Sequence, residues 1–164
     1  MPKIVKGDLI QMALNGEFEV IAHGCNCFCT MGAGIALAMK KTFGCDEYNL
    51  EDSKFSGSYL KMGNIQYKSF FVKNGAISTE GTPLKVYNIY TQYAPGVSLP
   101  PYDIPFDYDA FRLCIRKLLY TNKKSKIGLP WIGCGLGKAE KSRVKEIIEQ
   151  EEQGFKGEVW IVEL

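Results

Sequence analysis

The chain has 164 residues, of which 46% are hydrophobic and 23% charged, and its formal net charge is +2. These values are ordinary for one soluble globular domain, so we expect a single domain over residues 1–164. The small net charge does not require nucleic acid as a partner, and no apolar run approaches the roughly 20 residues of a membrane-spanning helix.

The N-terminal segment MPKIVKGD does not have the pattern of a signal peptide, so we expect a cytoplasmic protein. Its six cysteines should then be reduced rather than paired in disulfides. The basic run NKKSK at 122–126 is interpreted as a solvated turn. We expect a monomer that has neither a membrane nor a nucleic acid as its partner.

The first half of the chain predicts two strands and a helix. KIVKG at 3–7 and FEVIAHG at 18–24 have strand-like patterns, and the nearly continuous apolar residues of the second are typical of a strand covered on both faces. Residues 33–43 predict a helix with one apolar face and two lysines turned outward. The apolar face consists of Ile35, Ala38, Met39 and Phe43, and the lysines are Lys40 and Lys41.

The second half continues the alternation. Strand-like runs at 64–72 and 84–92 are followed by a proline-rich loop, YAPGVSLPPYDIP, and a helix over about 107–120. The apolar residues of that helix recur with helical spacing at Phe111, Cys114, Ile115 and Leu118. A short strand at 126–130, a helix near 139–152 and a final strand, EVWIVEL, complete the chain. This order predicts an α/β fold, a three-layer α/β/α domain with a central mixed, mostly parallel sheet.

Two glycine-rich segments lie where strands are predicted to lead into helices, which is where ligands bind in open α/β sheets. TMGAGIA (30–36) follows the strand that ends near His23, and PWIGCGLGKAE (130–140) follows the strand KIGL. Backbone amides at such junctions can bind an anion. Close packing of a helix against a strand is the alternative interpretation of the first segment. Together the two segments indicate a phosphate-bearing ligand, such as a diphosphate, held from two sides.

Cysteines and one histidine surround the first of these loops. Cys25, Cys27 and Cys29 would share one face of a strand, and they could bind a metal, supply a nucleophile activated by His23, or simply pack behind the loop. We favour packing, and expect no metal and no cofactor, because the other cysteines are scattered. His23 could be structural or catalytic, at the mouth of the loop. The amide of Asn26 could both donate to and accept from a sugar hydroxyl.

Four segments, KGDLI, AHGCNCFCTMGAGIA, LPWIGCGLG and the terminal IVEL, together resemble the macro domain family over essentially the whole chain. Within that family the chain is most similar to the branch of yeast ADP-ribose 1''-phosphate phosphatase and human terminal ADP-ribose protein glycohydrolase. The resemblance implies an α/β/α module whose ligand is ADP-ribose or a phosphorylated or protein-linked derivative of it.

The resemblance also implies roles for particular residues. Asp8 would accept from the adenine amino group, Leu9 and Ile10 would line the base, and Leu164 would close the adenine pocket. Asn26 would contact the distal ribose, and two loops would hold the diphosphate. One loop comprises Met31, Gly32, Ala33, Gly34 and Ile35; the other comprises Trp131, Ile132, Gly133, Cys134, Gly135, Leu136 and Gly137.

The chain departs from the glycohydrolase at two catalytic positions. Thr91 and Gln92 stand where the resemblance implies a threonine and a lysine, and glutamine cannot form a Schiff base. Gly137 stands where the glycohydrolase has an aspartate. His23 and Asn26 are therefore the expected catalytic residues of a phosphatase acting on ADP-ribose 1''-phosphate. A non-catalytic ADP-ribose reader, and a hydrolase that removes ADP-ribose from macromolecules without a lysine, are the alternatives.

Overall fold

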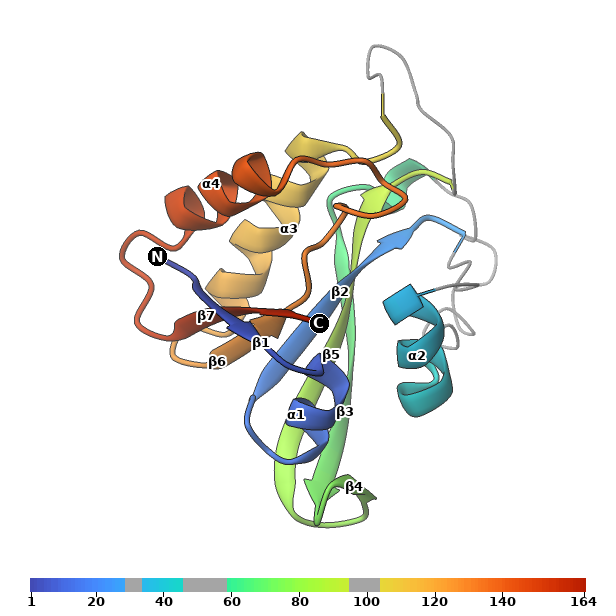
Figure 1. The fold of residues 1–164 in the computed structure, drawn as a ribbon, viewed down its shortest axis with the longest axis vertical. Helices are drawn as coiled ribbons and strands as arrows, with labels where there is room; N and C mark the ends of the chain where they lie inside the picture. Colours follow the sequence, from blue (N-terminus) through green and yellow to red (C-terminus); the bar gives the residue numbers. More distant parts are fainter. Residues whose placement is uncertain (29–33, 46–58, 95–103) are drawn as a thin grey trace.

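The computed structural model describes residues 1–28, 34–45, 59–94 and 104–164, and in this part of the chain a seven-stranded sheet separates two layers of helices (Figure 1). The strand order is β1-β7-β6-β2-β5-β3-β4. The strands are β1 (Lys3–Lys6), β2 (Val20–Asn26), β3 (Ile65–Lys73), β4 (Ala76–Ser78), β5 (Thr82–Gln92), β6 (Lys126–Leu129) and β7 (Glu158–Glu163). The helices are α1 (Leu9–Leu14), α2 (Gly34–Phe43), the 3-10 turn η3 (Tyr59–Lys61), α3 (Tyr108–Thr121) and α4 (Lys141–Glu151).

Five neighbouring strands, β1, β7, β6, β2 and β5, pair in parallel, whereas β3 pairs antiparallel with both β5 and β4. The prediction of a mixed, mostly parallel sheet is therefore confirmed. Because the five parallel strands run in one direction, their carboxyl ends meet at one edge of the sheet. That edge carries the loops discussed below.

The two faces of the sheet are covered by different helices, and this explains why the sequence of β2 is almost continuously apolar. Val20 and Ala22 belong to the core under α3 and α4, and Ile21 and Cys25 belong to the core under α1 and α2. Successive side chains of a strand point to opposite faces, so a central strand with helices on both sides needs apolar residues at every position.

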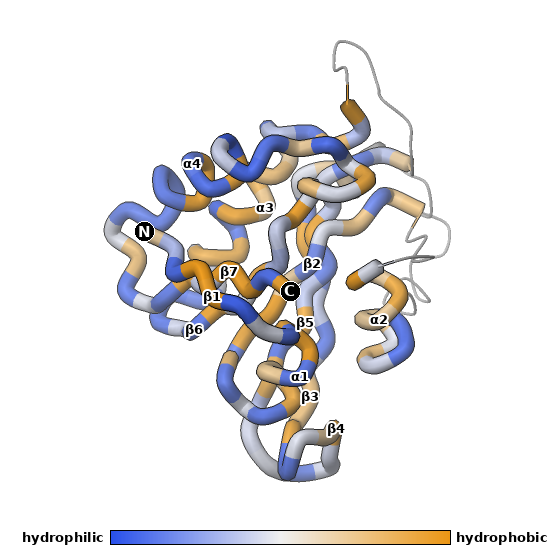
Figure 2. The backbone as a smooth tube through the Cα atoms, viewed as in Figure 1, coloured by the Kyte–Doolittle hydropathy of each residue, from blue (hydrophilic) through white to orange (hydrophobic). Residues whose placement is uncertain are grey.

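The helix predicted over 107–120 is confirmed as α3. Its four predicted apolar residues, Phe111, Cys114, Ile115 and Leu118, are all buried. The helix begins after Asp107, whose carboxylate accepts hydrogen bonds from the amides of Asp109 at 2.9 Å and Ala110 at 3.0 Å. Figure 2 shows that α4 carries more hydrophilic residues than α3, as its sequence predicts for a helix that buries a narrower stripe.

One helix has no counterpart in the sequence prediction, and one prediction about local structure needs correction. The helix α1 was not predicted, because its six residues are too few for a clear apolar period. The apolar face assigned to α2 is also only half buried: Met39 and Phe43 lie in the core, but Ile35 and Ala38 are exposed. These two side chains line a cavity instead. No helix in the described part of the chain is both long and apolar enough to cross a membrane.

Candidate functional site

A cavity of about 780 Å³ opens at the carboxyl edge of β1, β7 and β6, between α1 and α2. Its size lies within the range of roughly 300–1,000 Å³ that is usual for small-molecule sites. The structure brings nine predicted ligand-binding residues to its walls. They are Asp8, Leu9, Ile10, Gly34, Ile35, Trp131, Cys134, Gly135 and Leu164.

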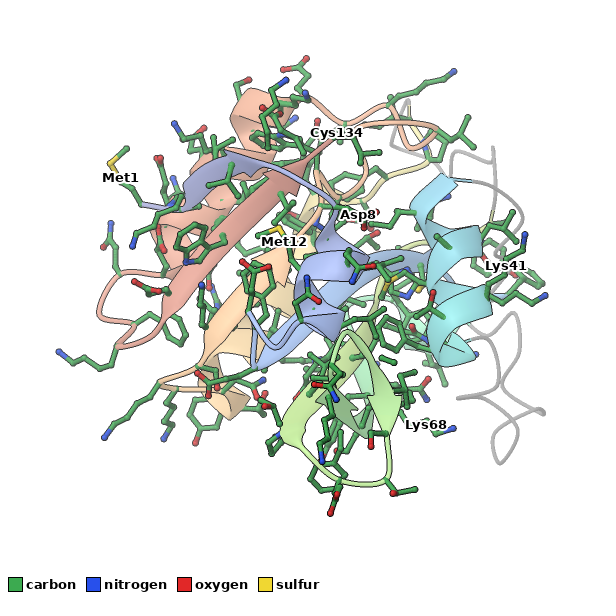
Figure 3. All side chains as sticks on the ribbon, turned by 60° about the horizontal axis from the view of Figure 1, so that its bottom comes forward. Met1, Asp8, Met12, Lys41, Lys68 and Cys134 are labelled. Carbon is green, nitrogen blue, oxygen red and sulfur yellow. The ribbon has the colours of Figure 1, made fainter. Side chains whose placement is uncertain are left out.

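Asp8 provides a carboxylate at one end of the cavity, where β1 passes into α1. Its Oδ1 accepts a hydrogen bond of 3.1 Å from the amide of Gln11, so the side chain caps α1. The cap fixes the carboxylate in place beside the apolar side chains of Leu9 and Ile10. Figure 3 shows Asp8 at this turn and Cys134 on the neighbouring loop before α4; both residues line the cavity.

The wall opposite α1 is formed by α2. Ile35, Ala38 and Thr42 line the cavity at helical spacing, and Gly34 lies at the first position of the helix. This wall explains the exposure of Ile35, of which 38% is accessible. An apolar stripe can face a cavity as well as a core, and sequence periodicity does not distinguish the two.

A charged cluster lies at the centre of the cavity edge, on the end of β7. The Nε1–H of Trp131 donates a hydrogen bond of 2.7 Å to Oε2 of Glu163. The ammonium of Lys141 lies 3.7 Å from the same oxygen and 5.3 Å from the centre of the Trp131 ring. The indole hydrogen bond and, to a lesser degree, the lysines lower the pKa of Glu163, so its carboxylate is ionised at neutral pH.

The glycine-rich loop before α4 divides into residues that reach the cavity and residues that do not. Trp131, Cys134 and Gly135 line it. Ile132 is buried in the core with 2% of its surface exposed, whereas Leu136 points to solvent with 81% exposed. Gly133 and Gly137 are also absent from the described cavity walls.

Gly133 shapes this loop. Its φ is +76°, in the left-handed region, and a Cβ at this position would lie 2.2 Å from the Phe106 ring. Its carbonyl accepts a hydrogen bond of 2.8 Å from the amide of Ala139. Only glycine allows both the turn and the close approach. The loop is thus held from beneath by Phe106, with Gly135 at its outer side.

The predicted distal residues end the next strands along the same edge, outside the described cavity. Asn26 ends β2 and is 7% exposed; its Oδ1 accepts a hydrogen bond of 2.9 Å from the amide of Phe28. Thr91 is buried at the end of β5, and Gln92 is partly exposed, with its Nε2 3.4 Å from the carbonyl of Ala94. Met31, Gly32 and Ala33 lie outside the described residues.

His23 was expected at the mouth of the site, and this placement is wrong. The imidazole is completely buried, with 0% exposed. Its Nε2 lies 2.8 Å from Oδ1 of Asn88, whose Nδ2 donates to the carbonyl of Cys45 at 2.9 Å. Because Asn88 uses its amide hydrogen on Cys45, its oxygen must accept, so Nε2 of His23 carries the proton. Burial lowers the pKa of His23 to about 4.

The first two cysteines of the C-x-C-x-C segment pack in the interior, as the packing interpretation predicted. Cys25 is 6% exposed and Cys27 0%. Sγ of Cys25 lies 3.6 Å from Nε2 of His23, within the buried network. Cys29 lies outside the described residues. In the stretches that the structure describes, no three metal-binding side chains gather into a site.

Sequence reasoning missed several cavity residues. Some of them are small residues or lie at the turn between β1 and α1. Others lie one position away from a predicted residue. Among the described residues, the missed ones are Lys6, Gly7, Ala38, Thr42, Pro130, Lys141, Val162 and Glu163. Glu163 and Lys141 are the chemically important omissions. The position of Glu163 beside the predicted Leu164, at the end of an apolar strand, was a usable signal.

No protein-family model matches the chain. It is 34% identical over 155 residues to an uncharacterized 17.5 kDa protein from the tk-vs intergenic region of Enterobacteria phage T4, and the match covers 90% of this chain and 87% of the phage protein.

Solved structures resemble the chain over its whole length. A crystal structure of a protein from Bacteroides thetaiotaomicron has a TM-score of 0.73 and 25% identity, with both chains fully covered. The macrodomain of Mycobacterium tuberculosis DarG has a TM-score of 0.63 and 18% identity, covering 100% of this chain and 99% of that one. Thermosipho africanus DarTG in complex with ADP-ribose has a TM-score of 0.72 and 17% identity, covering 100% of this chain and 42% of that one.

The sheet order, the helical layers and these similarities define the class: the chain has the macrodomain fold, as the resemblance of its four segments predicted. At the level of sequence, it belongs to one family with the phage T4 protein.

Proposed function

We propose that this chain binds ADP-ribose, with the adenosine half of the ligand in the cavity at the ends of β1, β7 and β6. The observation that carries the proposal is the combination in one cavity of a fixed carboxylate, apolar walls and two glycines, Gly34 and Gly135. Thermosipho africanus DarTG, of which 42% matches this fold, is in complex with ADP-ribose, which supports this choice of ligand.

The adenine would lie at the Asp8 end. The carboxylate there can accept from the exocyclic amino group, while Leu9, Ile10 and Leu164 offer apolar contacts to the two faces of the base. Asp8 uses Oδ1 to cap α1, and Oδ2 would be the oxygen that accepts from the ligand. This end therefore favours a base with an amino group.

The diphosphate would lie between the two loops. Gly34 is the first residue of the ten-residue helix α2, and Gly135 lies on the loop before α4. A Cβ on Gly135 would meet nothing within 4 Å, so the backbone there is open to a close ligand. The amides at a helix start favour negative charge. The distal ribose would then reach Asn26, at the end of the next strand.

For catalysis, we propose hydrolysis of the terminal phosphate of ADP-ribose 1''-phosphate: water attacks phosphorus, the bond from phosphorus to the ribose oxygen breaks, and ADP-ribose and inorganic phosphate leave. The resemblance at the segment HGCNC supports this activity, with Asn26 as the residue that contacts the distal ribose. The imidazole of His23 is completely buried and lies against Asn88, so we assign it the role of holding the interior beneath the site.

A non-catalytic reader of ADP-ribose is the second candidate. The burial of His23 favours it, because this imidazole was the expected proton-transfer group and it does not line the described cavity. The third candidate is a hydrolase that removes ADP-ribose from macromolecules without using a catalytic lysine. Assays of phosphate release and of peptide de-modification distinguish the three candidates.

Calorimetry with ADP-ribose tests binding. Asp8→Asn keeps an oxygen for the α1 cap but turns an amide NH₂ toward the adenine amino group, so affinity should fall about 10- to 100-fold. Asp107→Asn is the matched control, since Asp107 caps α3 and does not line the cavity. Equal affinity of the wild type and Asp8→Asn, or no binding of ADP-ribose by the wild type, would contradict the proposal.

Phosphate release from ADP-ribose 1''-phosphate, followed beside mass spectrometry of an ADP-ribosylated peptide, tests activity. A phosphatase releases phosphate and loses that activity in Asn26→Ala. A reader binds ADP-ribose and leaves both substrates unchanged. A hydrolase that removes ADP-ribose from macromolecules releases it from the modified peptide and leaves ADP-ribose 1''-phosphate unchanged.

A further inference from the structure

The parallel strands end in a fixed order along the cavity edge, and this order parallels the order of groups in the proposed ligand. Asp8 follows β1, Glu163 ends β7, Trp131 follows β6 and Asn26 ends β2, and these strands are consecutive neighbours in the sheet. ADP-ribose is a linear chain of adenine, ribose, diphosphate and ribose. With adenine at Asp8 and the distal ribose at Asn26, the adenosine ribose falls opposite the end of β7.

Glu163 is held at this point with one oxygen engaged. Oε2 accepts from the indole of Trp131 at 2.7 Å and faces the ammonium of Lys141 at 3.7 Å. Within the described part of the chain, no hydrogen bond is made to Oε1. The side chain is 29% exposed and lines the cavity. An ionised carboxylate with a fixed orientation and an open oxygen is an acceptor suited to hydroxyl groups.

We propose that Glu163 accepts hydrogen bonds from the hydroxyl groups of the adenosine ribose and thereby selects ligands in which this ribose carries no phosphate. The inference rests on the proposed binding of ADP-ribose and specifies which form of it is bound. A carboxylate beside a ribose binds the free 2'-hydroxyl and repels a 2'-phosphate, a discrimination that nucleotide-binding sheets elsewhere also make at a strand end.

Two lysines lie beside Glu163, and they could produce the opposite preference, for a ligand that carries a 2'-phosphate. Lys6 is the register partner of Glu163 on β1, and Lys141 lies on the other side at the start of α4. Both residues line the cavity. If these two cations controlled the subsite, a 2'-phosphate would strengthen binding. The carboxylate should prevail because Trp131 holds it in place, whereas the side chain of Lys141 is 60% exposed and not tightly paired.

The experiment compares two ligands, ADP-ribose and ADP-ribose 2'-phosphate, by calorimetry on the full chain. The wild type should bind ADP-ribose at least about tenfold more tightly. Glu163→Gln keeps an oxygen for Trp131 but loses the charge, so its affinity for ADP-ribose should fall about fivefold and its preference should shrink to about threefold or less.

Glu158→Gln is a matched control from the same strand. Glu158 also accepts from a tryptophan, with Trp160 Nε1 at 3.2 Å from Oε2, and also pairs with a lysine, Lys3, at 2.9 Å. It lies at the opposite end of β7 and does not line the cavity. Glu158→Gln removes the same charge as Glu163→Gln but leaves the adenosine-ribose subsite unchanged, so the ligand preference should not change.

The outcomes separate the inference from the proposed function. If the wild type binds both ligands equally, or prefers the 2'-phosphate, the role of Glu163 is overturned while ADP-ribose binding stands. If the wild type binds neither ligand, the proposed function fails and the inference falls with it. The wild-type comparison needs no folded variant, so it decides the matter even if Glu163→Gln is unstable; thermal melting of each variant shows whether it is.

Discussion

The imidazole of His23 lies 2.8 Å from the amide oxygen of Asn88, and this contact joins the two central strands β2 and β5 inside the protein. The two residues are also register partners in the sheet. Through the second bond of Asn88, to the carbonyl of Cys45, the same pair reaches the segment that follows α2. One wall of the cavity is therefore connected to the sheet by a buried polar chain.

The burial of His23 predicts a pH dependence of stability. Its pKa is about 4 in the folded protein and about 6.5 in the unfolded chain, so the unfolded state binds the extra proton first as pH falls. The free energy of unfolding should be unaffected by this group above pH 6.5 and should fall by about 3 kcal/mol between pH 6.5 and 4. Urea unfolding at several pH values measures it. In His23→Gln this component of the slope should vanish; an unchanged slope would contradict the prediction.

Two glycines of the loop before α4 should respond differently to alanine. Gly133 has φ +76° and a Cβ there would strike Phe106, so Gly133→Ala should lower the free energy of unfolding by about 2–4 kcal/mol. Gly135→Ala meets nothing within 4 Å and should change stability by less than about 1 kcal/mol. Chemical denaturation of both variants provides the comparison. Similar losses in the two would show that Phe106 does not support the loop.

The two tryptophans should report ligand binding unequally. Trp131 lines the cavity and bonds to Glu163, whereas Trp160 packs near Lys3 and Lys126, away from the cavity walls. ADP-ribose should change the fluorescence of the wild type and of Trp160→Phe, and the change should be largely lost in Trp131→Phe. Fluorescence titration measures this directly. A full signal in Trp131→Phe would place the ligand elsewhere.

Cys134 should be protected from alkylation by ligand. Its side chain is partly buried in the cavity wall, and burial raises the pKa of its thiol, so modification should be slow and should speed up as pH increases. Cys114 is fully buried, with a pKa raised to about 12, and should stay unmodified in the folded protein. Peptide mass spectrometry after iodoacetamide treatment follows each cysteine separately. Equal rates at Cys134 with and without ADP-ribose would contradict a ligand at this wall.

Local patterns predicted the elements of this fold well, because most of them have a regular period. The four apolar residues of α3 and the continuous apolar run of β2 are examples in which burial dictates the residue at each position. The helix α1 had no such signal, since six residues beside a capping Asp8 do not establish a period.

The candidate site was predictable only where its residues belong to recognisable loops. Ile35 was assigned both to the core face of the helix and to the ligand-binding residues. The spacing of apolar residues cannot show whether a given side chain faces the hydrophobic core or a cavity. The partner of His23 lies 65 positions away, so its burial could not be inferred from its neighbours. The pairing of Glu163 with Trp131 is likewise a product of strand order, because β7 lies beside β6 and β1 only in the folded sheet.

The place of β7 has a consequence for how the protein is made. Among the described strands, β1 lies at the edge of the sheet and pairs with β7 alone, and β7 joins it to β6. During synthesis, β1 and the Asp8 turn cannot make this pairing until residues 158–163 have left the ribosome. The adenosine end of the cavity therefore depends on contacts between residues more than 150 positions apart, such as Lys3 with Trp160, and contacts of such long sequence separation form slowly. Ligand binding thus requires β7 to be in place, and a nascent chain halted before β7 should have no affinity for the ligand.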